Sequence, residues 1–190
     1  ATPEILAAVR GGLLRSQAVA GTSALASDPE GRALGESDKD RREHAWVVDG
    51  ICRALAPWGA ARASQAQIAR AGEVQHLVSE VSLSLPRGVS VIDAAARLHP
   101  TAALCGEPRA SAARWIGEVE RIDRGWYAGP LGWCSPVGDG VVAVAIRSLL
   151  MNARRTGTCP RSSTTRRATR SRTRSRITGR VVEDCLMNAD

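Results

Sequence analysis

Tyr127 and Arg147 are the two residues whose types and spacing most clearly indicate a binding chemistry. They lie in the strand-like runs RGWYAGPLGWC and VVAVAIRSLL, which the segment SPVGDG joins. The Asp-Gly pair in that segment is a strong turn former, and a turn centred near residue 137 makes Tyr127 and Arg147 approximate cross-strand neighbours. A guanidinium fork and a phenol hydroxyl on one face would suit a carboxylate. The alternative is a surface arginine stacked on an aromatic ring.

Two further elements precede this hairpin at the start of the chain. ATPEILAAVRGGLLRSQAVAGT predicts a β-hairpin, because Gly11 and Gly12 supply the positive φ of a tight turn. SDKDRREHAWVVDGICRALAP predicts a helix, with Ser37 as its N-cap and Asp40 at the capping-box distance. The apolar residues of that helix fall on one stripe, which consists of Val47, Ile51 and Leu55.

The middle of the chain predicts one strand and two helices. VQHLVSEVSLSL alternates apolar and polar residues, as a half-buried strand does. VSVIDAAARLHP predicts a short helix stopped by Pro100, and PRASAARWIGEVERID predicts another helix. The preceding stretch SALASDPEGRALGE is polar and rich in turn formers, so it predicts a loop.

The positive charge of the protein is concentrated in one segment. The formal net charge is +7, but residues 154–180 hold ten arginines and no acidic residue, so the rest of the chain is mildly acidic. Lys39 is the only lysine in the sequence. A protein that binds nucleic acid usually spreads basic residues over a folded face, so no nucleic-acid partner is expected.

The cysteines and the hydropathy pattern indicate a soluble protein of a reducing, cytoplasmic compartment. The five cysteines are scattered, and they form neither a disulfide framework nor a zinc motif. No signal-peptide block opens the chain, and nowhere do eighteen apolar residues run together, so no membrane contact is expected.

Several phrases of the sequence together resemble one enzyme family. They are ATPE, AGT, SDKDRREH, VQHL, LHPTAALCGEPR, DRGWYAGPLGWC and GDGVVAVAIR. In this order and spacing they resemble the chorismate-binding enzymes, over residues 1 to about 150. The resemblance implies an α/β (α+β) fold, a partial sandwich with a mainly antiparallel sheet and outer helices. Residues 1–153 would form the partial domain, 154–180 an Arg/Ser/Thr-rich segment and 181–190 a residual C-terminal segment.

The resemblance also implies roles for residues of the reaction centre. Glu4 matches the general acid, a glutamate that must be protonated to help the C4 hydroxyl of chorismate leave. His76 matches the histidine near the reacting ring. Gly21 and Thr22 match the loop against the substrate, where glycine permits close approach of the backbone.

The remaining implied roles concern the anionic groups of the substrate. Glu43 matches a ligand of Mg²⁺, the family's cofactor, and Asp40 sits where a second acid often supports it. Residues at i and i+3 share a helix face, so the two carboxylates could reach one cation. Tyr127 and Arg147 match the residues that grip the enolpyruvyl carboxylate, which agrees with the hairpin argument.

The pair Ala103-Leu104 bears on the reaction. Family members that eliminate pyruvate or aminate chorismate tend to carry threonine at the position of Ala103, whereas isochorismate synthases resemble this chain in having Ala then Leu. The resemblance therefore favours an isochorismate synthase, with salicylate synthase and anthranilate synthase component I as alternatives. It does not decide between a menaquinone and a siderophore pathway, and the protein is expected to be a monomer.

The Arg-rich segment stands where the family has a glycine-alanine-glycine loop and a helix with the second magnesium glutamate. The family's catalytic lysine belongs to a strand upstream of ATPE and is not in this chain. Our hypothesis is a pair of compensating frameshifts over residues 154–180, which predicts that the chain alone is inactive. The alternatives are a disordered tail or an inactive remnant with a polyanion-binding arm.

Overall fold

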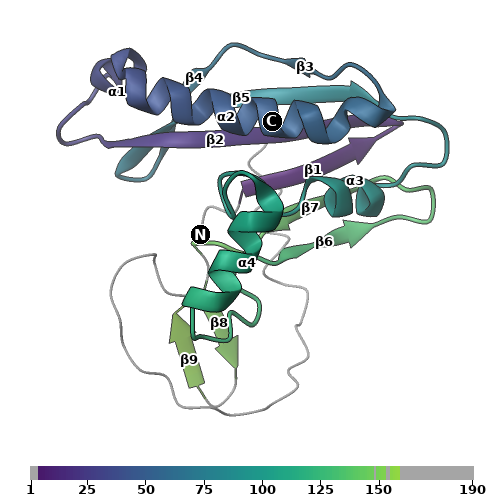
Figure 1. Cartoon of the computed structure of the whole chain (residues 1–190). Coiled ribbons are helices and arrows are strands. Elements are labelled where there is room, and N and C mark those ends of the chain that lie inside the picture. Colours follow the sequence, from purple (N-terminus) through teal and green to yellow (C-terminus); the bar gives the residue numbers. More distant parts are fainter. Residues whose placement is uncertain (1–3, 148, 153–154, 159–190) are drawn as a thin grey trace.

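The computed structural model describes residues 4–147, 149–152 and 155–158 (Figure 1). The strands are β1 (Glu4–Arg10), β2 (Leu13–Ala24), β3 (Arg62–Ala63), β4 (Gln67–Ala71), β5 (Val74–Ser84), β6 (Pro130–Cys134), β7 (Gly140–Val144), β8 (Leu149–Asn152) and β9 (Arg155–Thr158). The helices are α1 (Arg32–Glu36), α2 (Asp38–Leu55), α3 (Val91–Leu98) and α4 (Arg109–Val119), and a 3₁₀ turn (Ala56–Trp58) follows α2.

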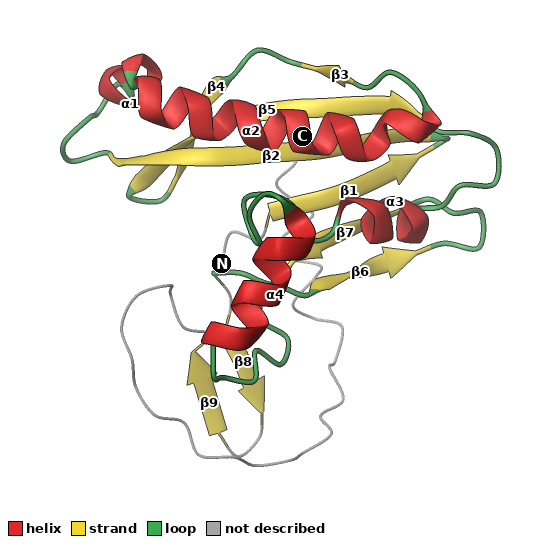
Figure 2. Cartoon of the chain, in the orientation of Figure 1, coloured by secondary structure: helices red, strands yellow, loops and turns green. Residues whose placement is uncertain are grey.

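Seven strands form one antiparallel sheet. Six of them follow the order β3-β5-β2-β1-β7-β6, and β4 also pairs with β5. Helix α2 runs along β2 and β5, and α3 packs against β1 and β7 (Figure 2). Strands β8 and β9 pair separately. This architecture confirms the predicted fold class, a mainly antiparallel sheet with helices outside it.

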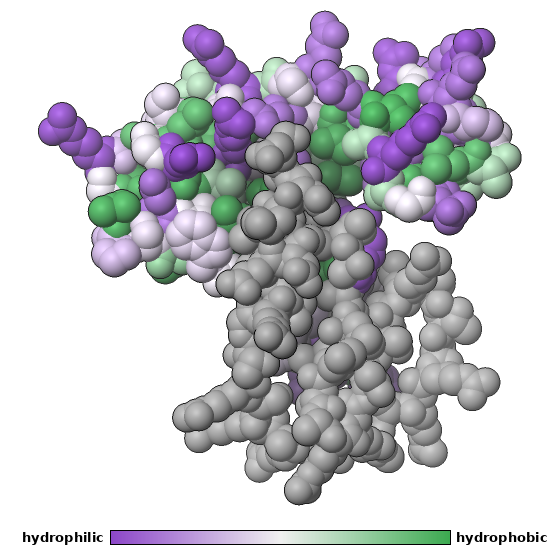
Figure 3. Space-filling view, turned by 180° about the vertical axis from the view of Figure 1, so that it is seen from behind, coloured by the Kyte–Doolittle hydropathy of each residue, from purple (hydrophilic) through white to green (hydrophobic). Residues whose placement is uncertain are grey.

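The hydrophobic core lies between the sheet and these two helices. Burial alternates along β5, so that residues such as Val81 point to the helices while the intervening residues point away. The apolar stripe of α2 that ends with Ile51 and Leu55 packs against these buried residues of the sheet, as the sequence predicts. Seen from behind, the part of the molecule that is not drawn in grey carries a mixture of hydrophobic and hydrophilic residues (Figure 3). Leu14 and Leu13 show the difference between the faces, since they are 0 % and 39 % exposed.

Both predicted hairpins form. Gly11 and Gly12 have φ values of 57° and 77° at the β1–β2 turn. Pro130 pairs with Val144, which places the centre of the β6–β7 turn at residue 137, as predicted. The run VVAVAIRSLL is not a single strand, however, because β7 ends at Val144. Helix α1 and strands β3 and β4 also lie in segments for which the sequence predicts no regular structure.

Most of the Arg-rich segment, and all of residues 181–190, lie outside the described residues. Strand β9 falls at the start of that segment. The boundaries at residues 153 and 180 and the frameshift hypothesis therefore stay predictions. Among the helices that the structure describes, none has the length and hydropathy to cross a membrane.

The first prediction concerns the two faces of β2. Replacing Leu14 with Ala removes a fully buried side chain from the core, so we expect the free energy of unfolding to fall by about 2–5 kcal/mol. Leu13→Ala is the matched control on the other face, with an expected loss under about 1 kcal/mol. Urea denaturation of both variants tests this. Equal losses would mean that the core does not lie on the helix side of the sheet.

Candidate active site

Four of the predicted site residues meet at one end of the sheet. The Oγ1 of Thr22 lies 2.8 Å from Nδ1 of His76, and Nη1 of Arg147 lies 3.2 Å from Nε2 of the same ring. Nη2 of Arg147 donates to Oε1 of Glu4 at 3.0 Å. We call Glu4, Thr22, His76 and Arg147 the Arg147 cluster. Its members come from β1, β2, β5 and the segment after β7, so the sheet brings together residues 143 positions apart in the chain.

A bulge in β2 sets the position of Thr22. The register between β2 and β5 shifts between Ala20 and Thr22, and Gly21 between them has a φ of 79°. Beyond the bulge, Thr22 pairs directly with His76. A Cβ on Gly21 would lie 3.1 Å from the Cβ of Asp40, so the glycine lets helix α2 approach the strand closely. The neighbour that the glycine accommodates in this structure is a helix, and the predicted close approach of Gly21 to a substrate stays a prediction.

Arg147 lies beyond the last residue of β7, in a backbone conformation unusual for its type. Its φ is 51°, in the left-handed region that side chains other than glycine seldom adopt. Such a conformation costs on the order of 1 kcal/mol or more, and it persists where the surroundings compensate for it. The guanidinium of this residue contacts both Glu4 and His76.

Burial and the guanidinium act in opposite directions on Glu4. The Glu4 side chain is 18 % exposed, and this burial raises its pKa above the ordinary 4.5, while the positive charge of Arg147 partly offsets the rise. Burial is the larger effect. A carboxyl with a raised pKa in a partly closed site is suited to donate a proton.

The same guanidinium fixes the state of His76. Burial lowers the pKa of His76 below 6.5, and the charge of Arg147 lowers it further. Because a guanidinium can only donate hydrogen bonds, Nε2 of the ring must accept, which leaves the proton on Nδ1 to be donated to Thr22. We therefore assign His76 as a neutral imidazole protonated on Nδ1.

Tyr127 does not join Arg147, contrary to the cross-strand expectation. The regular pairing ends at Pro130 and Val144, and Tyr127 lies in the turn before β6. Its ring packs against the guanidinium of Arg124, 5.6 Å away. Two more backbone hydrogen bonds join the segments, from the N–H of Ala128 to the carbonyl of Ala145 and from the N–H of Ala145 to the carbonyl of Gly129, and Tyr127 lies in the turn just before them, where Ala128 has a φ of 62°. The sequence correctly located the hairpin; Tyr127 and Arg147 are not ladder partners in it, and their joint binding of a carboxylate stays a prediction.

His99 holds the turn that precedes β6, and the sequence patterns do not single it out. Its Nε2 lies 2.8 Å from the carbonyl oxygen of Ala128, next to Tyr127. The contact ties the end of α3 to the turn that carries Tyr127. His99 belongs to the phrase LHPT. Its position between the end of a helix and Pro100 is the feature of the sequence that could have indicated its contact with the turn.

Asp40 and Glu43 lie one turn apart at the start of α2. Ser37 accepts a hydrogen bond from the backbone N–H of Asp40, which confirms the predicted N-cap. Glu43 forms an ion pair with Lys39 at 3.2 Å, and its side chain is 44 % exposed. No group of three potential metal-ligating side chains occurs in the described part of the chain. Carboxylate oxygens such as those of Asp40 and Glu43 are the ligands that Mg²⁺ prefers, and magnesium binding here stays a prediction.

Ala103 and Leu104 lie in the turn between α3 and α4. Ala103 is exposed, whereas Leu104 packs against the hydrophobic core. No hydrogen bond is recorded between this turn and the Arg147 cluster. The influence of Ala103 on the choice of reaction therefore stays a prediction.

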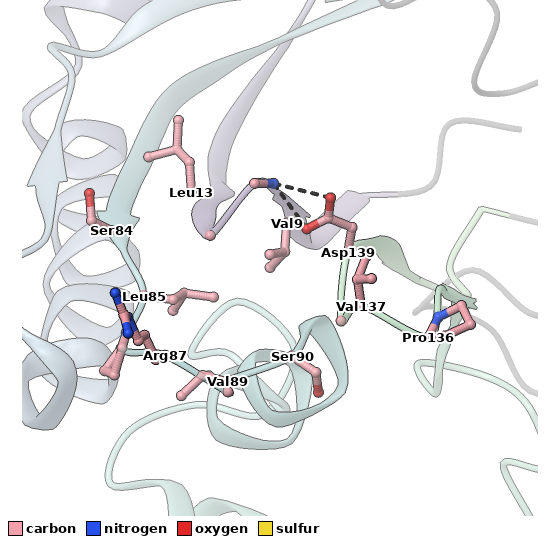
Figure 4. Close-up of a pocket in the computed structure, with 15 residues that line it drawn as sticks. Val9, Leu13, Ser84, Leu85, Arg87, Val89, Ser90, Pro136, Val137 and Asp139 are labelled. Carbon is pink, nitrogen blue, oxygen red and sulfur yellow. Dashed lines mark hydrogen bonds between the residues drawn. The ribbon is translucent and has the colours of Figure 1, made fainter.

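A separate cavity of about 610 Å³ lies among the turns at the other end of β1 (Figure 4). Its lining includes Val9, Leu85 and Arg87, and the carboxylate of Asp139 accepts hydrogen bonds from the backbone N–H of Gly11 at 3.0 and 3.1 Å. None of the predicted site residues lines it. This cavity and the Arg147 cluster therefore lie at opposite ends of β1.

The fold of this chain is shared with a known class of enzymes. The family model described as "Chorismate binding enzyme" matches residues 1–157. The chain belongs to the chorismate-binding enzyme family, as the sequence phrases indicate.

Three similar proteins illustrate the relationship. The salicylate biosynthesis isochorismate synthase of Pseudomonas aeruginosa is 39 % identical over 158 residues, which are 80 % of this chain and 33 % of that protein. The solved structure of MenF, the menaquinone-specific isochorismate synthase of Escherichia coli, is 33 % identical with a TM-score of 0.71, covering 77 % of this chain and 35 % of that one. Anthranilate synthase component I of Streptococcus pneumoniae is 27 % identical with a TM-score of 0.68, covering 77 % and 34 %. The chain thus spans about a third of the length of these relatives.

The second prediction concerns the protonation of His76. At pH 7 we expect the ¹⁵N shifts of a labelled protein to report a neutral ring with the proton on Nδ1, because Arg147 can only donate to Nε2. As the pH falls below 6.5, the unfolded chain binds a proton at this histidine before the folded protein does, so stability should decrease. His76→Gln should reduce that acid-dependent loss. A ring protonated on Nε2, or one that titrates above 6.5, would contradict the assignment.

Proposed function

We propose that this protein is part of an isochorismate synthase, which converts chorismate and water into isochorismate. Water adds at C2 of the ring and the C4 hydroxyl leaves. The observation that carries the proposal is the partly buried carboxyl of Glu4, paired with a guanidinium that also contacts the imidazole of His76, in a chain similar to isochorismate synthases. Those relatives are named isochorismate synthases, and we infer the same activity for the protein to which this chain belongs.

Each member of the Arg147 cluster has a role in this proposal. Glu4 donates the proton that the departing C4 hydroxyl needs, which its raised pKa favours. Arg147 binds a substrate carboxylate through its guanidinium fork. His76 and Thr22 form one wall of the site. They accept hydrogen bonds from the ring substituents or donate hydrogen bonds to them. Gly21 keeps the neighbouring backbone close to helix α2.

Magnesium is the cofactor implied by the family. Glu43 would hold it, with support from Asp40, and the chain as described supplies these two carboxylates of a larger ligand set. When bound, the ion would neutralise the ring carboxylate of chorismate. The ion pair between Glu43 and Lys39 would have to open for Glu43 to serve as a ligand.

Two other functions remain as alternatives. Salicylate synthase and anthranilate synthase component I share the family, and they would release pyruvate. An inactive remnant with a polyanion-binding arm would depend on residues 154–180, most of which lie outside the described residues. We favour the isochorismate synthase because of Ala103-Leu104 and the names of the relatives.

The proposal includes a cytoplasmic location and a monomeric state. Cys52, Cys105 and Cys134 are free thiols, which suits a reducing compartment. Chorismate is the proposed partner molecule, and neither a membrane nor a nucleic acid is expected. The pathway that uses the product, menaquinone or siderophore synthesis, is left open.

The third prediction tests Glu4 in a complete enzyme. In the P. aeruginosa relative, the segment that matches residues 4–147 would be replaced by the segment from this chain. The chimera should form isochorismate without pyruvate, as measured by chromatography of the products. Glu4→Gln should lower its kcat by about 10²- to 10⁴-fold, because the leaving hydroxyl loses its acid.

The control for this experiment is Glu80→Gln, a substitution at an exposed carboxylate of β5 that pairs with Arg15. This variant should keep the rate of the chimera. An undiminished rate in Glu4→Gln would remove Glu4 from the proposed mechanism, and pyruvate release by the unmodified chimera would favour the alternative reactions.

The fourth prediction concerns the choice of reaction. In the same chimera, Ala103→Thr adds a hydroxyl at the position where pyruvate-releasing members tend to carry one, so we expect part of the product to be formed with release of pyruvate. Valine has nearly the same shape as threonine but no hydroxyl, so Ala103→Val should leave the product unchanged. Identical products from both variants would show that this position does not select the reaction.

A further inference from the structure

One guanidinium holds both reactive groups of the cluster at once. Arg147 donates through Nη2 to Glu4 at 3.0 Å and through Nη1 to His76 at 3.2 Å. Arg147 and Glu4 have side chains that are 34 % and 18 % exposed, so their ion pair is partly shielded from water. In this arrangement the guanidinium opposes the rise that burial causes in the pKa of Glu4, and the lone pair on Nε2 of His76 is already used.

An incoming carboxylate changes the balance of charge in this site. Before it enters, one cation faces one anion. A substrate carboxylate that binds Arg147 brings a second anion, and a single guanidinium in a shielded site cannot neutralise both. The carboxyl that loses the guanidinium then binds a proton from water, as one of two closely spaced carboxyls does. The site as a whole becomes neutral again.

The backbone around Arg147 permits such an exchange. The residue lies outside β7, and its N–H and carbonyl are not part of the strand pairing. Its φ of 51° lies in the left-handed region that side chains other than glycine seldom adopt, so a move to an ordinary backbone conformation would lower the energy. The guanidinium can therefore turn toward a ligand without breaking a hydrogen bond between strands.

We propose that Arg147 is a latch that a carboxylate opens: in the free protein it occupies Glu4 and His76, and a ligand carboxylate that takes the guanidinium releases both side chains. Released Glu4 becomes a protonated acid, and Nε2 of His76 becomes free to accept a hydrogen bond from a substrate hydroxyl. Proton donation by Glu4 is thereby confined to the occupied site. This inference rests on the proposed function for the identity of the ligand, chorismate.

The fifth prediction follows the Glu4 carboxyl directly. In the full chain labelled with ¹³C at glutamate carboxyls, the pKa of Glu4 would be measured by NMR for the unmodified protein and for Arg147→Gln. Loss of the guanidinium should move the pKa of Glu4 upward, since burial then acts alone, and should move the pKa of His76 upward as well. Arg53→Gln, which removes the arginine of the exposed pair with Glu107 at 3.3 Å, is the matched control and should move neither.

Chorismate is then added to the unmodified chain as the probe. Its binding, seen in the amide signals of residues near Thr22, should shift the Glu4 pKa toward the value of Arg147→Gln. The Arg147→Gln variant should bind chorismate at least about tenfold more weakly, because a charge-assisted hydrogen bond is lost.

The outcomes separate the latch from the proposed function. If chorismate binds and the pKa of Glu4 stays unchanged or falls, the latch is wrong and the function stands. If chorismate does not bind, the proposed function fails for this chain, and Arg147→Gln still decides whether the guanidinium controls Glu4 and His76. An unchanged Glu4 pKa in that variant would overturn the latch irrespective of the ligand.

Discussion

The pairing of β2 with β5, interrupted by the bulge at Gly21, is the constraint on which the rest of the structure depends. The two strands pair over almost their whole length, and their inward side chains form the surface on which α2 packs. At the bulge the positive φ of Gly21 brings the strand against Asp40 and turns Thr22 toward His76. One glycine thus couples the position of the helix to the position of the polar site.

The polar site arises where strands end rather than where they are regular. Glu4 opens β1, and Arg147 follows β7, so both side chains lie at the margin of the core. Partial burial there is enough to raise the pKa of a carboxyl and to lower that of an imidazole, and a single guanidinium still reaches both. Fully buried positions would make an unpaired charge too costly, and exposed positions would leave both pKa values close to normal.

Much of the fold could be predicted from sequence, because its strongest signals are local. Gly11-Gly12 and the Asp-Gly turn located two hairpins, and the stripe of Val47, Ile51 and Leu55 gave the face of α2. Strand β4 could not be found this way, because its residues are mostly exposed and do not alternate. Tyr127 is not a ladder partner of Arg147, because a register rule applies only within the strands and Tyr127 lies in the turn before β6. Nothing in the spacing distinguished Glu4 from a surface acid, and the resemblance to a family of enzymes supplied that residue.

The resemblance and the geometry together lead to an account in which water replaces the C4 hydroxyl of chorismate. The most direct test is the reaction of the chimera described above in H₂¹⁸O, with mass spectrometry and NMR of the product. The account predicts isochorismate that carries one solvent oxygen, at C2, and no release of pyruvate. A product whose hydroxyl oxygen comes from chorismate itself, or a product formed with loss of pyruvate, would contradict it.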